Sequence, residues 1–147
     1  MNPATLTGLQ LLQAAAAGQL PRASISDTMG MTGLTAEEGR IVIRARADER
    51  HLNALGGVHG GFAAAVLDTV TGCAVHTLLG PGVGYGTVDL GVKMLRPVPR
   101  GEDLVAEGRV THLSRSLGVA EGTLRDAAGK LLASASATCF IQQPRTP

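Results

Sequence analysis

The chain has 147 residues, of which 44% are apolar, 17% charged and 2% aromatic, and its formal net charge is +1. A charge this close to zero gives little electrostatic attraction to nucleic acid or to an anionic membrane, and so few aromatic side chains leave almost nothing to stack on bases. The length predicts a single domain spanning residues 1–147 with a sizeable core. The low charged fraction indicates that part of the surface is hidden between subunits.

The same composition predicts the compartment and the redox state. The N-terminus lacks the basic, apolar and small-residue segments of a secretion signal, and no apolar run is long enough to span a bilayer. Cys73 and Cys139 are the only cysteines, and neither stands at a spacing typical of a zinc ligand. We therefore expect a soluble, cytoplasmic protein with two free thiols and no metal site.

In the N-terminal third, the pattern predicts a short helix followed by two strands. Residues 5–17 are rich in Leu and Ala and stop at a glycine, which favours a short helix packed on the body of the domain. Residues 27–34 are expected to form an irregular first strand. Its Met29 and Met31 either line an apolar site or simply fill the core. Residues 40–47 alternate apolar and polar side chains, as a strand with one wet face does.

After an expected loop over 48–58, the composition of residues 61–79 predicts a helix. This helix is apolar nearly all the way round and is therefore expected to be buried. Asp68 is its only fully charged residue, facing either solvent or a site. Gly60 and Gly61 at the helix start leave N–H groups open, and the helix dipole favours negative charge there, so an oxyanion hole is plausible. The eight residues from Gly60 to Asp68 span about 12 Å of helix, too far to share one carbonyl. Two antiparallel copies of the helix would bring them together, so the hypothesis requires a two-fold dimer.

Downstream of a glycine-rich connector, alternating segments predict an antiparallel sheet that ends in a frayed tail at 142–147. A single sheet wrapped around one apolar helix satisfies this order, which makes the class α+β with a core over about 27–141. Such a sheet covers the helix on one side only, so the pattern also asks for a second subunit. The expected strands are 87–95, 104–113, 117–125 and 131–141.

Together, these residues resemble a known family, the hotdog-fold acyl-CoA thioesterases of the phenylacetic-acid-degradation (PaaI-like) type. The resemblance covers roughly residues 34–141 and is carried by Asn53, His59-Gly60-Gly61, Asp68, Thr87-Val88-Asp89-Leu90 and Arg96-Pro97. It implies a hotdog fold, in which an antiparallel sheet wraps one long central helix. It also implies a homodimer that pairs into a homotetramer, and an acyl-CoA substrate, with no cofactor because coenzyme A is part of the substrate.

The resemblance also implies a role for each matching residue. Asp68 would be the nucleophile or the general base toward the thioester, and the Gly60 N–H would donate to the thioester oxygen. His59 would orient this turn, and Asn53 would bind near the reacting carbonyl or water. Thr87 would assist the carboxylate from its own subunit, although the glycine-rich connector leaves room for a slip by one residue, onto Gly86.

For substrate binding, the resemblance points to basic and small residues around the coenzyme A phosphates. The turn at Arg115 and Ser116 matches one that related enzymes place near the nucleotide, and Arg96 and Arg100 are second choices. Gly61, at the start of the helix, is also a predicted substrate-binding residue. The acyl pocket is less defined, and its candidate residues are Met29, Met31, Leu55, Phe62 and Leu90.

Our prediction is hydrolysis of an aryl- or medium-chain acyl-CoA to the free acid and coenzyme A. Two alternatives remain open: a non-catalytic acyl-CoA binding or sensor module and, ranked lower, an enoyl-thioester hydratase or dehydratase. The remaining histidines show no ligand spacing and are expected to be structural or on the surface, and Asp89 is expected to be exposed on a strand. These residues are His51, His76 and His112.

Overall fold

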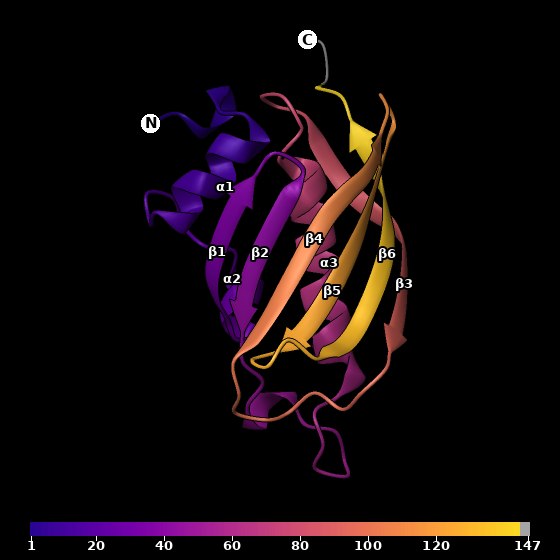
Figure 1. Cartoon of the computed structure of the whole chain (residues 1–147). Coiled ribbons are helices and arrows are strands. Elements are labelled where there is room, and N and C mark those ends of the chain that lie inside the picture. The colour runs from indigo at the N-terminus through magenta and orange to yellow at the C-terminus, as the bar shows by residue number, and fades with distance from the viewer. Residues whose placement is uncertain (145–147) are drawn as a thin grey trace.

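The computed structural model describes residues 1–144 and consists of an antiparallel sheet curved around one long helix (Figure 1). The sheet has six strands in the order β1-β2-β4-β5-β6-β3. The central helix is α3 (Gly60–His76), and the short helices α1 (Gly8–Ala16) and α2 (Ser24–Thr28) lie beside β1. The strands are β1 (Met31–Glu37), β2 (Arg40–Ala45), β3 (Gly84–Met94), β4 (Leu104–Leu113), β5 (Leu117–Asp126) and β6 (Leu131–Gln142), and two short 3₁₀ turns are η1 (Pro3–Thr5) and η2 (Glu49–His51).

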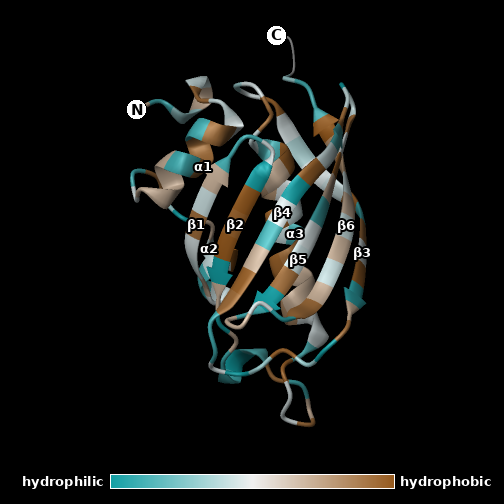
Figure 2. Ribbon diagram, viewed as in Figure 1, coloured by the Kyte–Doolittle hydropathy of each residue, from teal (hydrophilic) through white to brown (hydrophobic). Residues whose placement is uncertain are grey.

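The packing of α3 on the sheet explains its apolar composition. The helix buries Phe62, Val66, Leu67 and Val70 among its core residues. Strand β4 approaches so closely that a Cβ atom on Gly108 would lie 2.1 Å from the carbonyl oxygen of Val70. Only glycine allows this contact, so the sheet rests directly on the helix backbone. Figure 2 shows the alternation of hydrophobic and hydrophilic residues along the strands that such one-sided burial requires.

The predicted central helix, the four C-terminal strands and the alternation of β2 are confirmed. Ile41, Ile43 and Ala45 face the core from β2, as the pattern indicated. The helix begins one residue earlier than predicted, at Gly60, and ends at His76 instead of residue 79. Of the predicted tail, Gln142 is the last residue of β6, while 145–147 lie outside the described residues.

The prediction of a first strand at 27–34 is wrong in its first half. Residues Asp27 and Thr28 belong to α2, and β1 begins only at Met31 and continues to Glu37. The break falls at Gly30, which has φ +61° and packs so tightly that a Cβ atom would lie 2.2 Å from the Arg46 carbonyl oxygen. A contact between distant segments therefore sets this boundary. Similarly, α1 begins at Gly8, after the Thr7 cap, and not at residue 5.

Strand β3 forms one edge of the sheet and pairs only with β6. It is longer than predicted because it begins at Gly84, inside the glycine-rich segment expected to be a connector. Val88 is 66% exposed and Met94 56% exposed, so apolar side chains stand on an open edge. No helix among residues 1–144 is long and apolar enough to cross a membrane.

Candidate active site

The Asp68 carboxylate is the least satisfied polar group among residues 1–144. It projects from the middle of α3, and its Oδ1 atom is buried without a hydrogen-bond partner in this part of the chain. Leaving a buried polar atom unpaired costs free energy that a folded protein ordinarily avoids. The expected solvent-facing alternative therefore does not hold for this oxygen, and the position suits a group that acts on a bound molecule.

Asp68 faces a group of protonated side chains on α3 and on the neighbouring strands β3 and β6. Burial raises the pKa of Cys73 to about 11, the hydroxyl of Tyr85 lowers it through a hydrogen bond, and the Asp68 charge raises it further. Burial likewise raises the pKa values of Tyr85 and Cys139, to which the Asp68 charge adds. Cys73, Tyr85 and Cys139 therefore stay neutral near neutral pH.

Thr87 lies next to this cluster. Its hydroxyl is 3.9 Å from the Sγ atom of Cys139, and this contact lowers the thiol pKa against the effect of burial. The strand is irregular here, because the pairing of β3 with β6 shifts register between Thr87 and Asp89. Gly86 precedes the irregularity and pairs with Phe140. Asp89 is exposed on the strand, as expected.

The start of α3 presents open backbone donors. His59 is the N-cap residue, and its Nδ1 atom accepts a hydrogen bond from the Gly61 N–H at 2.7 Å. The cap fixes the ring so closely that a Cβ atom on Gly61 would lie 2.9 Å from Nδ1. Among residues 1–144 the Gly60 N–H has no acceptor, so it points its hydrogen outward at the positive end of the helix dipole. His59 thus holds the first turn of α3, and its orienting role toward a substrate stays a prediction.

Asn53 closes the loop that precedes the helix. Its Oδ1 atom accepts from the Leu55 N–H at 2.9 Å and from the Gly57 N–H at 3.2 Å. These two bonds fix the orientation of the amide, and among residues 1–144 its Nδ2 atom has no acceptor. The residue is exposed and is tied by its own N–H to the Gly57 carbonyl at 2.8 Å. Asn53 is thus a pre-oriented donor at the same end of the molecule as His59.

Within one chain, Gly60 and Asp68 remain apart. Both lie on the uninterrupted helix α3, so the about 12 Å expected from helix geometry separates them. Arg96 is close to the helix start instead, because it shares a cleft of about 300 Å³ with Gly60 and Met94. The Arg96 guanidinium also donates to the Leu131 carbonyl at 2.7 Å. Within one chain, Arg96 therefore lies near Gly60, whereas Asp68 does not.

Arg115 and Ser116 lie at the opposite end of the sheet from this cleft. Their turn is fixed to β6, since the Arg115 carbonyl accepts from Gln143 at 3.1 Å and that of Ser116 from Ile141 at 2.9 Å. The cleft beside Gly60 includes Ala133, near the other end of β6. From Ala133 to Ile141 a strand spans about 26 Å, so one chain cannot use both ends for one ligand head group. Arg100 approaches Glu49, at 3.9 Å.

The residues predicted to line the acyl pocket do not lie together in the structure. Leu55 is 97% exposed at a loop tip, whereas Phe62 is buried with its ring 4.9 Å from that of His51. Met29 and Leu90 pack against the core. Only Met31 lines a large cavity.

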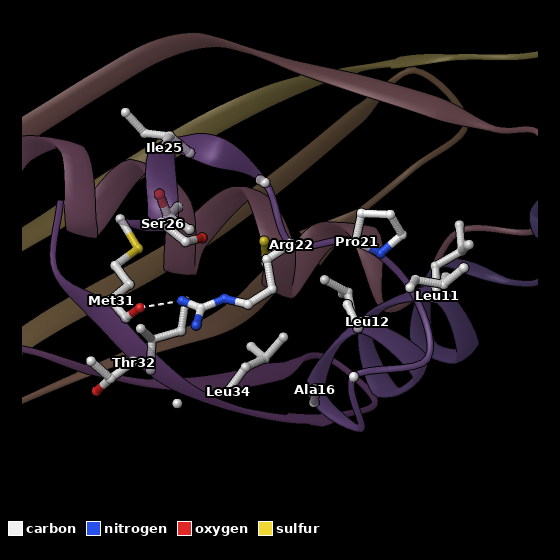
Figure 3. A pocket seen from close by; sticks show the side chains of 18 residues that line it. Leu11, Leu12, Ala16, Pro21, Arg22, Ile25, Ser26, Met31, Thr32 and Leu34 are labelled. Atoms are coloured by element: carbon white, nitrogen blue, oxygen red, sulfur yellow. Dashed lines mark hydrogen bonds between the residues drawn. The ribbon is translucent and has the colours of Figure 1, made fainter. Parts of the chain in front are cut away.

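Sequence reasoning gave an apolar site at Met31 as one alternative but missed the extent of this cavity, which has a volume of about 470 Å³ and lies between the N-terminal helices and β1 (Figure 3). Helix α3 contributes Thr69 and Cys73 to it. The apolar spacing of residues 5–17 was the available signal, but it indicated packing and could not show that a space remained.

The remaining histidines behave as structural or surface groups. His51 is buried, its Nδ1 atom accepts from the Asp48 N–H at 3.0 Å, and its Nε2 atom lies 2.6 Å from the Thr28 carbonyl. Burial lowers the pKa of His76, and His112 is exposed. Residues 1–144 contain no group of His, Cys, Asp and Glu side chains arranged to hold a metal ion.

Comparison with known proteins gives consistent matches over most of the chain. A family model described as the thioesterase superfamily matches residues 55–133. Acyl-coenzyme A thioesterase 13 of Homo sapiens is 32% identical over 106 residues, which cover 70% of this chain and 74% of the human protein. A phenylacetic acid degradation-related protein of Ralstonia eutropha superposes with a TM-score of 0.80 and 30% identity, over 88% of this chain and 98% of that one. The PaaI protein of the E. coli phenylacetic acid degradation operon superposes at 0.78 with 21% identity, over 90% and 93% of the two chains, and shows likeness of fold alone.

Proposed function

The chain belongs to the thioesterase superfamily, has its hotdog fold and is a thioester hydrolase, and on that basis we propose that it hydrolyses an aryl- or medium-chain acyl-CoA to the free acid and coenzyme A. The name of the human relative supports coenzyme A as the thiol. The observation that carries the proposal is the buried, unpartnered Oδ1 atom of Asp68 in the middle of the central helix.

The proposed site is shared between two copies of the chain. With two α3 helices antiparallel, Asp68 of one subunit would face Gly60 of the partner subunit across one thioester carbonyl. The open edge of β3 supports this arrangement, because an edge strand with exposed apolar side chains such as Val88 is commonly covered by a partner. We further expect these dimers to pair into tetramers.

In this site the Gly60 N–H would stabilise the transition state. Its hydrogen is free and lies at the positive end of the helix dipole, where the negative charge on the thioester oxygen would develop. As a general base, Asp68 would take a proton from water while the hydroxide oxygen bonds to the carbonyl carbon. The carbon–sulfur bond then breaks, and the coenzyme A thiolate leaves and is protonated by solvent. As a nucleophile, Asp68 would attack the carbonyl carbon and expel the coenzyme A thiolate, and water would then hydrolyse the resulting acyl anhydride to the free acid and the Asp68 carboxylate.

Three neighbouring residues would position these groups. His59 holds the helix start through its bond to the Gly61 N–H, and Asn53 has amide hydrogens free to bind the carbonyl or the water. Thr87 lies beside Cys139, a neighbour of Asp68, and would contact the carboxylate or the water from the same subunit.

Coenzyme A would enter at the Gly60 end, where Arg96 borders the cleft. In an antiparallel dimer, the turn with Arg115 and Ser116 comes from the other subunit, because it lies at the opposite end of the sheet from Gly60. The two basic elements that one chain keeps apart would thus meet across the interface and bind the phosphates.

The proposal is tested by free-thiol release from a panel of acyl-CoA esters, with wild type compared with Asp68→Asn. Loss of the base or nucleophile should lower kcat by about 10²–10⁴-fold. Glu102→Gln is the matched control, because it makes the same change on an exposed loop and should leave kcat unaltered. Full turnover in Asp68→Asn would overturn the role of Asp68. Tight binding by wild type without turnover would favour the binding module, and hydration of an enoyl ester would favour a hydratase.

A second experiment tests the shared site. Gly60→Pro removes the N–H, yet proline is favoured at the first helical position, and His59 already has the φ of −65° and ψ of 138° that a following proline requires. Gly60→Ala keeps the N–H and also places a Cβ atom against Met94, so the difference between the two variants isolates the donor. Removing this donor should lower kcat by about 10²–10³-fold.

Complementation then decides between one subunit and two. Asp68→Asn and Gly60→Pro are each inactive as homodimers under this proposal. Co-expressed at equal levels, they should recover about a quarter of the wild-type activity, because half of the dimers are mixed and each mixed dimer has one intact site of two. No recovery from mixed dimers would contradict the shared site.

A further inference from the structure

The cavity under the N-terminal helices has no part in the chemistry described above, yet it begins next to the catalytic carboxylate. It is enclosed by α1, α2, β1 and the side of α3 that carries Thr69 and Cys73 (Figure 3). Thr69 directly follows Asp68 on the helix, and Cys73 is close enough to Asp68 to be influenced by its charge. The cavity therefore lies along the part of α3 that carries Asp68, where it is placed to receive an acyl group whose carbonyl lies at Asp68.

We propose that this cavity binds the distal part of the acyl group, and that the preferred substrate is a medium- to long-chain alkanoyl thioester and not an aryl one. The inference rests on the proposed function and makes its substrate class specific. It also gives the N-terminal helices a role as the wall of the acyl site.

The chemistry of the cavity wall suits an alkyl chain. Most of the side chains that line it are apolar, including Leu11, Leu12 and Leu34. Two of its polar groups, the Thr69 hydroxyl and the Arg22 guanidinium, are already paired within the protein. The Thr69 hydroxyl donates to the Ala65 carbonyl at 2.9 Å, and the Arg22 guanidinium donates to the Met31 carbonyl, as the dashed line in Figure 3 shows. An alkyl chain would thus displace water without stripping these two groups of their partners.

The size of the cavity separates the two acyl classes. An engineered apolar cavity of about 150 Å³ is sufficient for benzene, and this cavity, at about 470 Å³, is roughly three times as large. A single aromatic ring would leave most of it empty. The lining also contains no Phe, Tyr or Trp on which a ring could stack. An alkyl chain gains about fourfold in affinity for each methylene that it buries, so its affinity rises until the chain fills the cavity.

The wall formed by α1 is held in place before any ligand arrives. Thr7 and Gln10 form a reciprocal cap at its start, with bonds of 2.9 and 3.3 Å. The Gly8 N–H donates to the Leu79 carbonyl at 3.0 Å, and the Gln13 side chain donates to the Ala36 carbonyl at 3.2 Å. These contacts fasten α1 both to the segment after α3 and to β1, so the cavity is preformed and can discriminate by length.

The test measures kcat/KM for a series of straight-chain esters from acetyl- through octanoyl- to palmitoyl-CoA, with phenylacetyl-CoA alongside. For wild type, kcat/KM should rise about fourfold per methylene until the cavity is filled. Ala15→Leu narrows the cavity, and by excluding about two methylenes it should lower kcat/KM for the long esters about 15-fold while sparing acetyl-CoA. Leu34→Ala widens the cavity and should move the optimum to longer chains.

Ala17→Leu is the matched control, because it makes the same change at an exposed position that follows α1 and does not line the cavity. Its chain-length profile should equal that of wild type. The inference is overturned if Ala15→Leu and Leu34→Ala hydrolyse every ester with the wild-type profile, or if phenylacetyl-CoA is preferred to all alkanoyl esters. Failure of the proposed function looks different, because wild type itself would then release no thiol from any ester.

Discussion

Replacing Asp68 with alanine should abolish hydrolysis and stabilise the fold at the same time. An unpartnered buried polar atom costs about 1–3 kcal/mol, and because Asp68 is only half buried as a residue we use the lower end of this range for its Oδ1 atom. Alanine in mid-helix contributes a further about 0.5 kcal/mol through its higher helix propensity. The free energy of unfolding should therefore rise by about 1.5 kcal/mol, which raises Tm by about 3–6 °C for a chain of this size.

The assay is thermal and urea unfolding of wild type and Asp68→Ala at neutral pH, at two protein concentrations so that subunit dissociation is separated from unfolding. Glu102→Ala is the control, since it removes an exposed carboxylate outside any helix and should leave Tm nearly unchanged. A fall in Tm confined to Asp68→Ala would refute the reasoning. It would mean that the carboxylate makes stabilising contacts in the assembled protein.

Substitutions at three further positions test the elements around the site. Gly8→Ala should lower the free energy of unfolding by about 1–3 kcal/mol, because a Cβ atom would lie 1.8 Å from the His76 carbonyl oxygen, and urea unfolding measures the loss. His59→Ala should cost about 1 kcal/mol through loss of the N-cap, whereas His59→Asn, which keeps an acceptor, should restore most of it in the same assay. Asp48 has its pKa lowered to about 2, mainly because the Arg50 side chain donates a hydrogen bond to it, so it adds stability above its usual pKa of 3.8 and loses it as the pH falls through 2. Asp48→Asn should therefore be less stable than wild type at neutral pH, and the difference should vanish in acid unfolding scans near pH 2.

Local patterns in the sequence predict the part of the fold that local physics controls. Alternation placed β2 and the last three strands correctly because each has one face on the core, and the apolar run after Gly60 identified α3. The turn between β5 and β6 is also local, since the Asp126 carboxylate accepts from two N–H groups of its own loop. Contacts between distant segments decide the remainder. Gly30, just after α2, packs against the Arg46 carbonyl oxygen, and the glycine-rich residues before Thr87 form a strand because β6 pairs with them.

The same division explains which parts of the candidate site could be predicted. His59 as a cap, the open N–H of Gly60 and the central position of Asp68 follow from a single helix, and the sequence indicates each of them. The unpartnered state of the Asp68 oxygen and its cluster with Cys73 and Tyr85 depend on strands that arrive from elsewhere. The cavity under α1 is harder still, because a helix that packs tightly and one that leaves a space have the same apolar spacing.

The geometry of α3 explains why the proposed site would require two chains. A helix offers an oxyanion donor only at its first turn, where N–H groups lack acceptors, while a carboxylate with a buried oxygen belongs further along, where the sheet covers it. Gly60 and Asp68 meet these two requirements on one helix, and for that reason they cannot meet each other within it. An antiparallel partner removes the conflict without any change of sequence. It does so twice per dimer, because the two-fold axis that brings Gly60 of the partner subunit to one Asp68 also forms the second site.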